Sequence, residues 1–265
     1  MDAEPTNSSE TNPGHSQRPS VLRISWTELL LLSWHFEPAV LRPWIPTDLD
    51  LDLFNGRAWV TVAASGMAQI RPCWMPALPW ISKGLSLGVR TYVRRGSERG
   101  LFLFSLDTNS TLTAACGRSL FHLPCFRAKT RLNEGENAVS FSSVRCHQGA
   151  SPAHFECTWR LSAPSGKPPE VAFPHFLSGR HQVFADHRGK LLSCRLQQSP
   201  FLLRQVTVES LHSSMLESAG IPRPEAEPFA HRADSRVVEI WPMRPVSADD
   251  DAASMLEPTL APPTG

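Results

Sequence analysis

Hydrophobic and polar residues alternate along much of this chain with the two-residue period of β-strands. The alternation is clean in LDLDLF at 49–54, and Asn55-Gly56 follows it, a strong signal for a tight hairpin. Residues 58–67 are predicted to be the partner strand of that hairpin. Further strands are predicted at 89–93, 101–106, 138–146, 154–161, 181–186, 190–196 and 235–241. The pattern therefore indicates a domain dominated by strands.

Helices are fewer, and three short ones are predicted at 37–46, 109–122 and 213–220. Pro38 stands near the start of the first, where its missing N–H is not needed. Asn109 or Ser110 is expected to cap the second helix, and Pro124 ends it. Gly220 supplies the residue that commonly closes a helix C-terminus. The fold class predicted is α+β with a large antiparallel sheet.

The two ends of the chain differ in composition from its middle. Residues 1–20 are rich in Ser, Pro, Asn and Glu, and residues 247–265 hold an acidic run followed by proline-rich sequence. Such segments bury too little apolar surface to fold, so both are predicted to be disordered tails. Residues 21–246 show no linker and no internal repeat, which indicates a single domain.

The net charge is +1, and no basic block stands out, which argues against nucleic-acid binding. The longest apolar runs, Leu29 to Leu32 and Leu101 to Phe104, are far too short to span a bilayer. The six cysteines are scattered with no CxxC motif, a distribution that favours reduced thiols. A cytoplasmic protein without a nucleic-acid or membrane partner is predicted.

Motifs for metals, phosphates and activated serines are missing from the sequence. His181 and His187 are six residues apart, and Cys146-His147 are adjacent, so neither pair has the close spacing of a structural zinc site. No GxSxG, GxGxxG or GxxxxGK[ST] pattern occurs. The sequence predicts no metal and no bound cofactor.

An arginine on an apolar strand is the first candidate for a binding residue. No carboxylate occurs between Asp52 and Glu98, yet Arg90 lies in this stretch, two residues from Tyr92 and so on the same strand face. An inward-facing arginine needs an anionic partner, because it keeps its charge. Asp107 on the neighbouring strand is one candidate partner, and a bound carboxylate ligand is another.

The segment RSLFHLPCFRAK at 118–129 holds a histidine and a cysteine on either side of a proline. A cysteine is often just a small buried apolar residue. A reactive thiolate at Cys125 would need a nearby cation, which Arg118, Arg127 or His122 could supply. The position after the C-terminal end of a helix opposes thiolate formation. The core and catalytic interpretations both remain open at this point.

Several segments together resemble a known family. They are residues 33–63, GVRTYV (88–93), FSLDTNS (104–110), AACGRSLFHLPCFRA (114–128) and VEIWPMRPV (238–246). They resemble the YqjF-like family of uncharacterised bacterial proteins (domain of unknown function 2071), from about Trp26 to Val246. That family is distantly similar to acetoacetate decarboxylase, so the resemblance implies a large antiparallel sheet curled into a cone or barrel around a ligand cavity.

Acetoacetate decarboxylase works through a Schiff-base lysine beside a second lysine, in the pattern Gly-Arg-Glu, an apolar stretch, then Pro-Lys-Lys. Matching the Gly-Arg at 117–118 and Pro124 puts Cys125 and Phe126 on the two lysines, and Ser119 on the glutamate. The catalytic acid of the family that precedes GVRTYV has no counterpart either. The resemblance thus implies the decarboxylase-like fold without Schiff-base chemistry.

Three functional hypotheses follow from the sequence. The first is the binding of a small organic anion in a sheet-lined cavity, with positive charge from Arg90 and Arg118. The other polar groups expected near that cavity are His122, Cys125, Tyr92 and Asp107. The alternative is a lyase, isomerase or hydrolase that uses His122 or Cys125 as acid–base or nucleophile. The third is an interaction or stabilising protein with a filled core.

Overall fold

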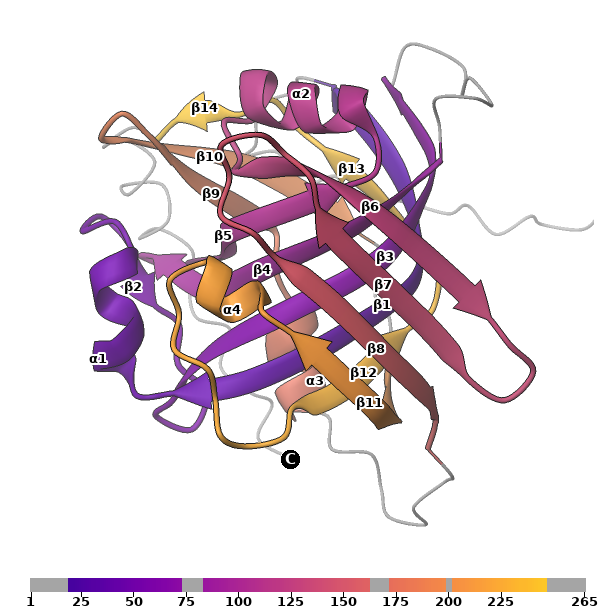
Figure 1. Cartoon of the computed structure of the whole chain (residues 1–265). Coiled ribbons are helices and arrows are strands. Elements are labelled where there is room, and N and C mark those ends of the chain that lie inside the picture. The colour runs from indigo at the N-terminus through magenta and orange to yellow at the C-terminus, as the bar shows by residue number, and fades with distance from the viewer. Residues whose placement is uncertain (1–18, 73–82, 163–171, 199–201, 247–265) are drawn as a thin grey trace, which may run out of the picture.

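The computed structural model describes residues 19–72, 83–162, 172–198 and 202–246. Apart from Pro19 and Ser20, the two predicted tails lie outside the described residues. One large sheet dominates the described chain, and short helices lie around it (Figure 1). The helices are α1 (Pro38–Leu41), the 3-10 turn η1 (Arg42–Trp44), α2 (Thr111–Leu120), α3 (Ala172–Ser178) and α4 (Met215–Ser218). No described helix is long and apolar enough to cross a membrane.

The strands follow the predicted list closely, with additions. They are β1 (Leu22–Phe36), β2 (Asp50–Leu51), β3 (Ala58–Pro72), β4 (Gly84–Arg95), β5 (Glu98–Thr108), β6 (Cys125–Glu134), β7 (Val139–Arg145), β8 (His154–Leu161), β9 (Gln182–His187), β10 (Lys190–Gln198), β11 (Leu203–Ser213), β12 (Phe229–Ala233), β13 (Arg236–Ile240) and β14 (Arg244–Pro245). The sheet is mixed rather than wholly antiparallel, because β5 pairs in parallel with both β6 and β9.

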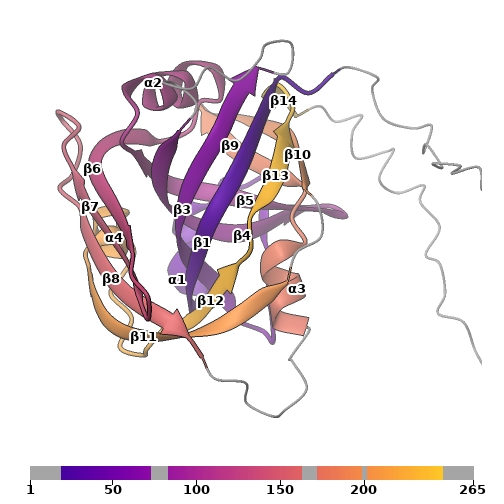
Figure 2. The same cartoon turned by 90° about the vertical axis from the view of Figure 1, so that its right-hand side faces the viewer.

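The sheet closes on itself in two rings that share β1, β3, β4 and β5. In the first, which we call the α3 ring, β5 continues through β9, β10 and β13 back to β1. In the second, the α4 ring, β5 continues through β6, β7, β8, β11 and β12 back to β1. Figure 2 shows the layer of β6, β7, β8 and β11 set apart from β1 and β3. Each ring takes its name from the helix whose apolar side chains enter its core.

The shared strands carry one core on each face. Leu30 and Leu32 of β1 pack in the α4-ring core, whereas Leu31 packs in the α3-ring core. A strand buried on both faces shows a continuous apolar run instead of an alternation, because neither face needs polar residues. This burial explains why the run of four leucines in β1 gave no strand signal in the sequence.

The hairpin predicted around Asn55-Gly56 is half correct. Both residues adopt the left-handed conformation (φ 51° and 72°), and Phe54 pairs with Arg57 across the turn. The strand before the turn, however, is only β2, and it pairs with β4. The predicted pairing with β3 is wrong because both edges of β3 are already hydrogen-bonded, one to β1 and the other to β4.

Other local predictions are confirmed. Ser110 caps α2 by accepting a hydrogen bond from the Thr113 amide at 3.1 Å. Gly220 follows α4 with φ 78°. Between the predicted strands 181–186 and 190–196, a turn at Arg188-Gly189 joins β9 to β10, and both residues are left-handed. The sequence analysis missed β11, β12 and α3. A proline usually indicates the end of a helix, but Pro174 lies in the first turn of α3, where a proline is tolerated.

Candidate functional site

Arg90 and Tyr92 lie on the inner face of the α3 ring, as their shared strand face predicts. Tyr92 belongs to the apolar core of that ring and is fully buried. Its hydroxyl is hydrogen-bonded to Thr61 Oγ1 at 2.7 Å, and Thr61 is bonded in turn to Ser33 Oγ at 2.8 Å. Arg90 is opposite Thr61 in the β3–β4 register and only partly buried. Tyr92 is thus held as a core residue, while Arg90 remains accessible.

A second arginine, which the sequence analysis missed, faces the same interior. Arg236 on β13 shares its strand face with Val238, a residue of the α3-ring core. It is opposite Trp26 of β1, and its guanidinium carbon lies 5.5 Å from the Trp26 ring centroid. The sequence signal for Arg236 was its position two residues before the apolar Val238, which places both side chains on one strand face.

The two arginines are close enough to influence one another. Burial, and secondly the charge of Arg90, lower the pKa of Arg236 to about 9. The Nε of Arg90 is buried and has no hydrogen-bond partner among the described residues. Two like charges facing one interior raise each other's free energy, and a bound carboxylate that accepts from both would relieve the repulsion. The arrangement therefore suits an anion.

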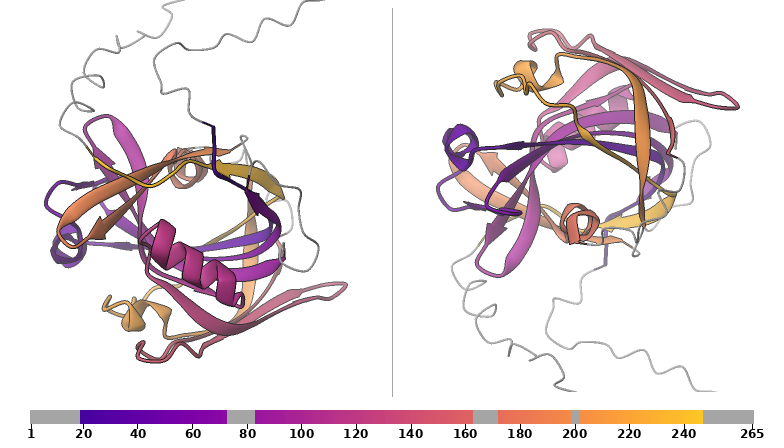
Figure 3. Two further views of the ribbon diagram at one scale, coloured as in Figure 1. Left: turned by 90° about the horizontal axis from the view of Figure 1, so that it is seen from above. Right: turned by 90° about the horizontal axis from the view of Figure 1, so that it is seen from below.

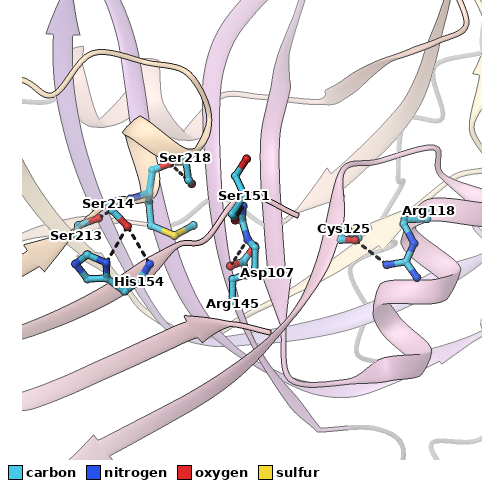
Figure 4. A network of polar contacts seen from close by, with 10 residues as sticks. Asp107, Arg118, Cys125, Arg145, Ser151, His154, Ser213, Ser214 and Ser218 are labelled. Carbon is cyan, nitrogen blue, oxygen red and sulfur yellow. Dashed lines mark hydrogen bonds and ion pairs between the residues drawn. The ribbon is translucent and has the colours of Figure 1, made fainter. Parts of the chain in front are cut away.

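The sequence suggested Asp107 as one of two candidate partners of Arg90, but the structure pairs Asp107 with a different residue. A register shift between Val89 and Arg90 in the β4–β5 pairing places Asp107 opposite Leu87, on the α4-ring face. There its two carboxylate oxygens accept hydrogen bonds from Arg145 Nε at 3.0 and 3.1 Å (Figure 4). Burial raises the pKa of Asp107, while Arg145 and His147 lower it.

Arg118 and His122 lie instead at a pocket where the sheet divides. Residues 100–102 of β5 pair with β9, whereas residues 106–108 pair with β6. A pocket of about 460 Å³ opens at this division, and we call it the fork pocket. Arg118, His122 and Asp186 line it together with aromatic side chains. Arg90 is not among its described lining residues.

The position of His122 follows from the way α2 ends. His122 adopts the left-handed conformation (φ 50°), and the Leu123 amide donates to the Gly117 carbonyl at 3.0 Å. A left-handed residue commonly closes a helix C-terminus, and glycine is more usual than histidine at that position. The His122 ring packs against that of His187, with centroids 4.1 Å apart and the ring planes tilted by 32°.

Cys125 is buried beneath α2 and is held there by its neighbours. A Cβ added to Gly117 would overlap the Cys125 Sγ, so the helix passes directly over the thiol. Arg118 Nη1 donates to the Cys125 carbonyl at 2.8 Å (Figure 4). Burial raises the pKa of Cys125 to about 12; Arg118 opposes this shift and Asp107 adds to it. The thiol is therefore neutral at physiological pH.

The six residues predicted from the sequence thus occupy four places. Arg90 and Tyr92 face the α3 ring, Asp107 faces the α4 ring, and Arg118 and His122 line the fork pocket. Cys125 is enclosed between α2 and the sheet. A larger groove of about 2020 Å³ runs along β11, β12 and residues 223–228, and none of the six is among its described lining residues.

We expect the cysteines to react with iodoacetamide in an order set by burial. Cys146 is exposed, whereas burial raises the pKa values of Cys125, Cys157 and Cys194 to about 12. Peptide mapping of the native protein at pH 8 should find Cys146 alkylated first, and these three only after unfolding. Alkylation of native Cys125 as fast as Cys146 would restore it as a candidate nucleophile.

Comparison with known proteins identifies the family of this chain. The model of the DUF2071 family, described as an uncharacterized conserved protein, matches residues 23–236. The chain belongs to the DUF2071 family. The uncharacterized protein YqjF of Bacillus subtilis (strain 168) is 28% identical over 225 residues, covering 84% of this chain and 92% of YqjF. The resemblance inferred from the sequence is confirmed.

Solved structures confirm the acetoacetate-decarboxylase-like fold of this DUF2071 member. An acetoacetate decarboxylase-like enzyme from Sphingomonas wittichii RW1 has a TM-score of 0.56 at 15% identity, covering 91% of this chain and all of that one. Acetoacetate decarboxylase from Legionella pneumophila has a TM-score of 0.55 at 15% identity, covering 90% and 93%. The enduracididine biosynthesis enzyme MppR, complexed with pyruvate, has a TM-score of 0.57 at 12% identity, covering 90% and 95%.

Proposed function

We propose that this protein binds a small organic anion inside the α3 ring, between Arg90 and Arg236. The observation that carries the proposal is that both guanidinium groups face one interior, where the charge of Arg90 helps to lower the pKa of Arg236. A carboxylate can accept hydrogen bonds from two guanidinium groups at once. Its negative charge would also offset the repulsion between them.

The class of ligand is a small carboxylate. The inner face around the arginines carries the hydroxyls of Ser65 and Ser86, which are bonded to each other at 2.8 Å, and the indole of Trp26. These groups offer polar contacts beside an apolar wall, as small-molecule sites commonly do. MppR, which shares the fold, was solved with pyruvate, a compound of this class.

Binding without an imine fits the residues at the lysine positions of the decarboxylases. Cys125 and Phe126 occupy those positions, and the described lysines Lys83, Lys129 and Lys190 are all exposed. A Schiff-base lysine needs an apolar surrounding or a neighbouring cation that depresses its pKa. An exposed lysine lacks the apolar surrounding.

An enzyme that uses Cys125 as its nucleophile is less well supported. The thiol is fully buried, and its pKa of about 12 keeps it protonated. Free thiols at all five described cysteines are compatible with the cytoplasmic location expected from the sequence. The location stands as part of this proposal.

Calorimetric titration with pyruvate tests the proposal. We expect Arg90→Gln and Arg236→Gln each to weaken binding by about tenfold or more, since a hydrogen bond to a charged group contributes about 1.5–3 kcal/mol. Arg94→Gln is the matched control, because Arg94 lies on the same strand with 52% of its side chain exposed. It should bind pyruvate like the wild type, and methyl pyruvate should bind to none of the proteins.

Two results would overturn the proposal. One is equal affinity of the wild type and both variants for pyruvate and other small carboxylates, with circular dichroism showing that the variants are folded. The other is a stable mass increase after borohydride treatment in the presence of pyruvate, which would reveal an imine.

A further inference from the structure

The fork pocket combines aromatic walls with one cation and one anion. Phe102 and Phe104 of β5 lie edge to face at 5.7 Å, and Phe184 of β9 is fully buried behind them. Trp44 completes the wall with 48% of its surface exposed. A large aromatic side chain left half open to solvent beside a pocket is typical of a binding surface.

Trp44 is fixed in place although it is exposed. Its ring lies so close to Gly220, at the end of α4, that an added Cβ would approach the ring atoms at 2.8 to 3.3 Å. Gly220 also has φ 78°, which a residue with a side chain rarely adopts. The fold therefore uses glycine at this position to seat the indole, and the wall of the pocket is pre-organised.

The two charged groups of the pocket are also oriented by the backbone. Arg118 Nη1 donates to the Cys125 carbonyl, which leaves the other guanidinium nitrogens for further contacts. Asp186 Oδ1 accepts from the Gly189 amide at 3.3 Å, within the turn between β9 and β10. The rings of His122 and His187, which pack against each other at a tilt, lie beside them. Neither charged side chain forms a salt bridge with another described residue.

We propose that the fork pocket is a second ligand site, which binds an aromatic α-amino acid through Arg118, Asp186 and the aromatic walls. The carboxylate of such a ligand would pair with Arg118, and its ammonium group would pair with Asp186. Its aromatic ring would pack against Trp44 and Phe104. The pocket volume of about 460 Å³ lies within the range of small-molecule sites. A simple anion would leave Asp186 facing a like charge, so the zwitterion fits better.

This site is separate from the α3-ring interior. Phe102, Phe104 and Phe184 pack in a third apolar cluster with Ile45 and Leu49, whereas Arg90 and Arg236 face the α3-ring core. The two proposals therefore fail independently.

Ligand-observed NMR with L-tryptophan and two derivatives tests the site. L-Tryptophanamide lacks the carboxylate, and N-acetyl-L-tryptophan lacks the ammonium group. We expect each derivative to bind about three- to fivefold more weakly than L-tryptophan, since exposed charge pairs contribute about 0–1 kcal/mol. Arg118→Gln should abolish the preference for tryptophan over its amide, and Asp186→Asn the preference over the N-acetyl compound.

Control variants separate the site from other causes. His122→Asn removes the imidazole, and asparagine tolerates the left-handed backbone at this position. It should lower affinity for all three compounds equally, and Arg90→Gln should change none of them. If N-acetyl-L-tryptophan binds as tightly as tryptophan, the proposal that the site recognises a zwitterion is wrong. Binding that Arg90→Gln removes and Arg118→Gln spares would place the ligand in the α3 ring and overturn the second site.

Discussion

Arg145→Met is expected to destabilise the protein by about 3–5 kcal/mol at neutral pH, the range found when one partner of a buried ion pair is removed. Arg145 and Asp107 expose 3% and 0% of their side chains, and Arg145 Nη2 lies 2.8 Å from Asp107 Oδ1. The guanidinium carbon also lies 4.3 Å from the Phe126 ring centroid. Methionine keeps the apolar contact with Phe126, so the loss reports on the uncompensated carboxylate.

The loss should depend on pH in a defined direction. Burial raises the pKa of Asp107 above its ordinary value, although Arg145 and His147 act against the shift. The folded state therefore binds this proton more tightly than the unfolded chain, and the carboxyl favours folding at acid pH. Removing Arg145 raises the pKa further. The stability difference between wild type and variant should thus be small at acid pH and grow as pH rises.

Urea denaturation of the variant between about pH 4 and pH 8 measures both effects. Asp107→Asn combined with Arg145→Met should recover part of the loss at neutral pH, because an amide needs no counter-charge. Arg160→Met is the control, since Arg160 and Glu209 form an exposed pair on β8 and β11 with side chains 58% and 42% exposed. It should change stability by less than about 1 kcal/mol. A loss at Arg145 independent of pH would contradict the assigned cause.

Gly117→Ala is the second substitution with a large expected effect. In an ordinary helix interior, replacing glycine by alanine stabilises by about 1 kcal/mol. At position 117 the new methyl group would overlap the Cys125 Sγ and lie 3.1 Å from its Cβ. Overpacking of this kind costs about 1–3 kcal/mol, so the clash outweighs the gain in helix propensity. We expect a net loss of stability, measured as a lower urea midpoint.

The same substitution in a Cys125→Ala background tests the contact directly. Removing Sγ removes the closest atom, so the penalty for Gly117→Ala should fall by about 1 kcal/mol or more relative to the wild-type background. Ser119→Ala, at an exposed position of α2, should change stability by less than about 0.5 kcal/mol. Equal penalties in the two backgrounds would show that α2 does not press on Cys125.

The position of Cys125 also bears on the missing catalytic lysine. Cys125, which the sequence resemblance places at the first lysine position, is enclosed by α2, with Gly117 directly over its side chain. Phe126, which the resemblance places at the second lysine position, faces Arg145. Cys125 thus lies near Asp107, and Phe126 lies against Arg145, at the buried Asp107–Arg145 pair.

Local features of the fold were predictable because short-range physics sets them. The turns at Asn55-Gly56 and Arg188-Gly189 need left-handed residues, and Ser110 provides a side-chain acceptor for a free helix amide. The inward direction of Arg90 followed from its distance of two residues from Tyr92. These inferences require no knowledge of which strands are neighbours.

Which strands lie next to each other was decided only by the tertiary structure. Figure 3 shows α2 in front of the strands in the view from above, and α3 end-on in the view from below. β5 has three partners, β4, β6 and β9, and it changes from β9 to β6 along its length. No pattern within the FSLDTNS segment encodes this exchange, because it depends on the closure of both rings.

The sequence by itself therefore determined the α+β class, most of the strands and the family resemblance. Only the tertiary structure decided that Arg236 joins Arg90, that Asp107 turns to Arg145, and that Arg118 and His122 lie at a separate pocket. The physical reason is that a side chain's strand face can be read from local spacing. Which distant side chains share that face is fixed by register shifts and ring closure, such as the bulge beside Arg90.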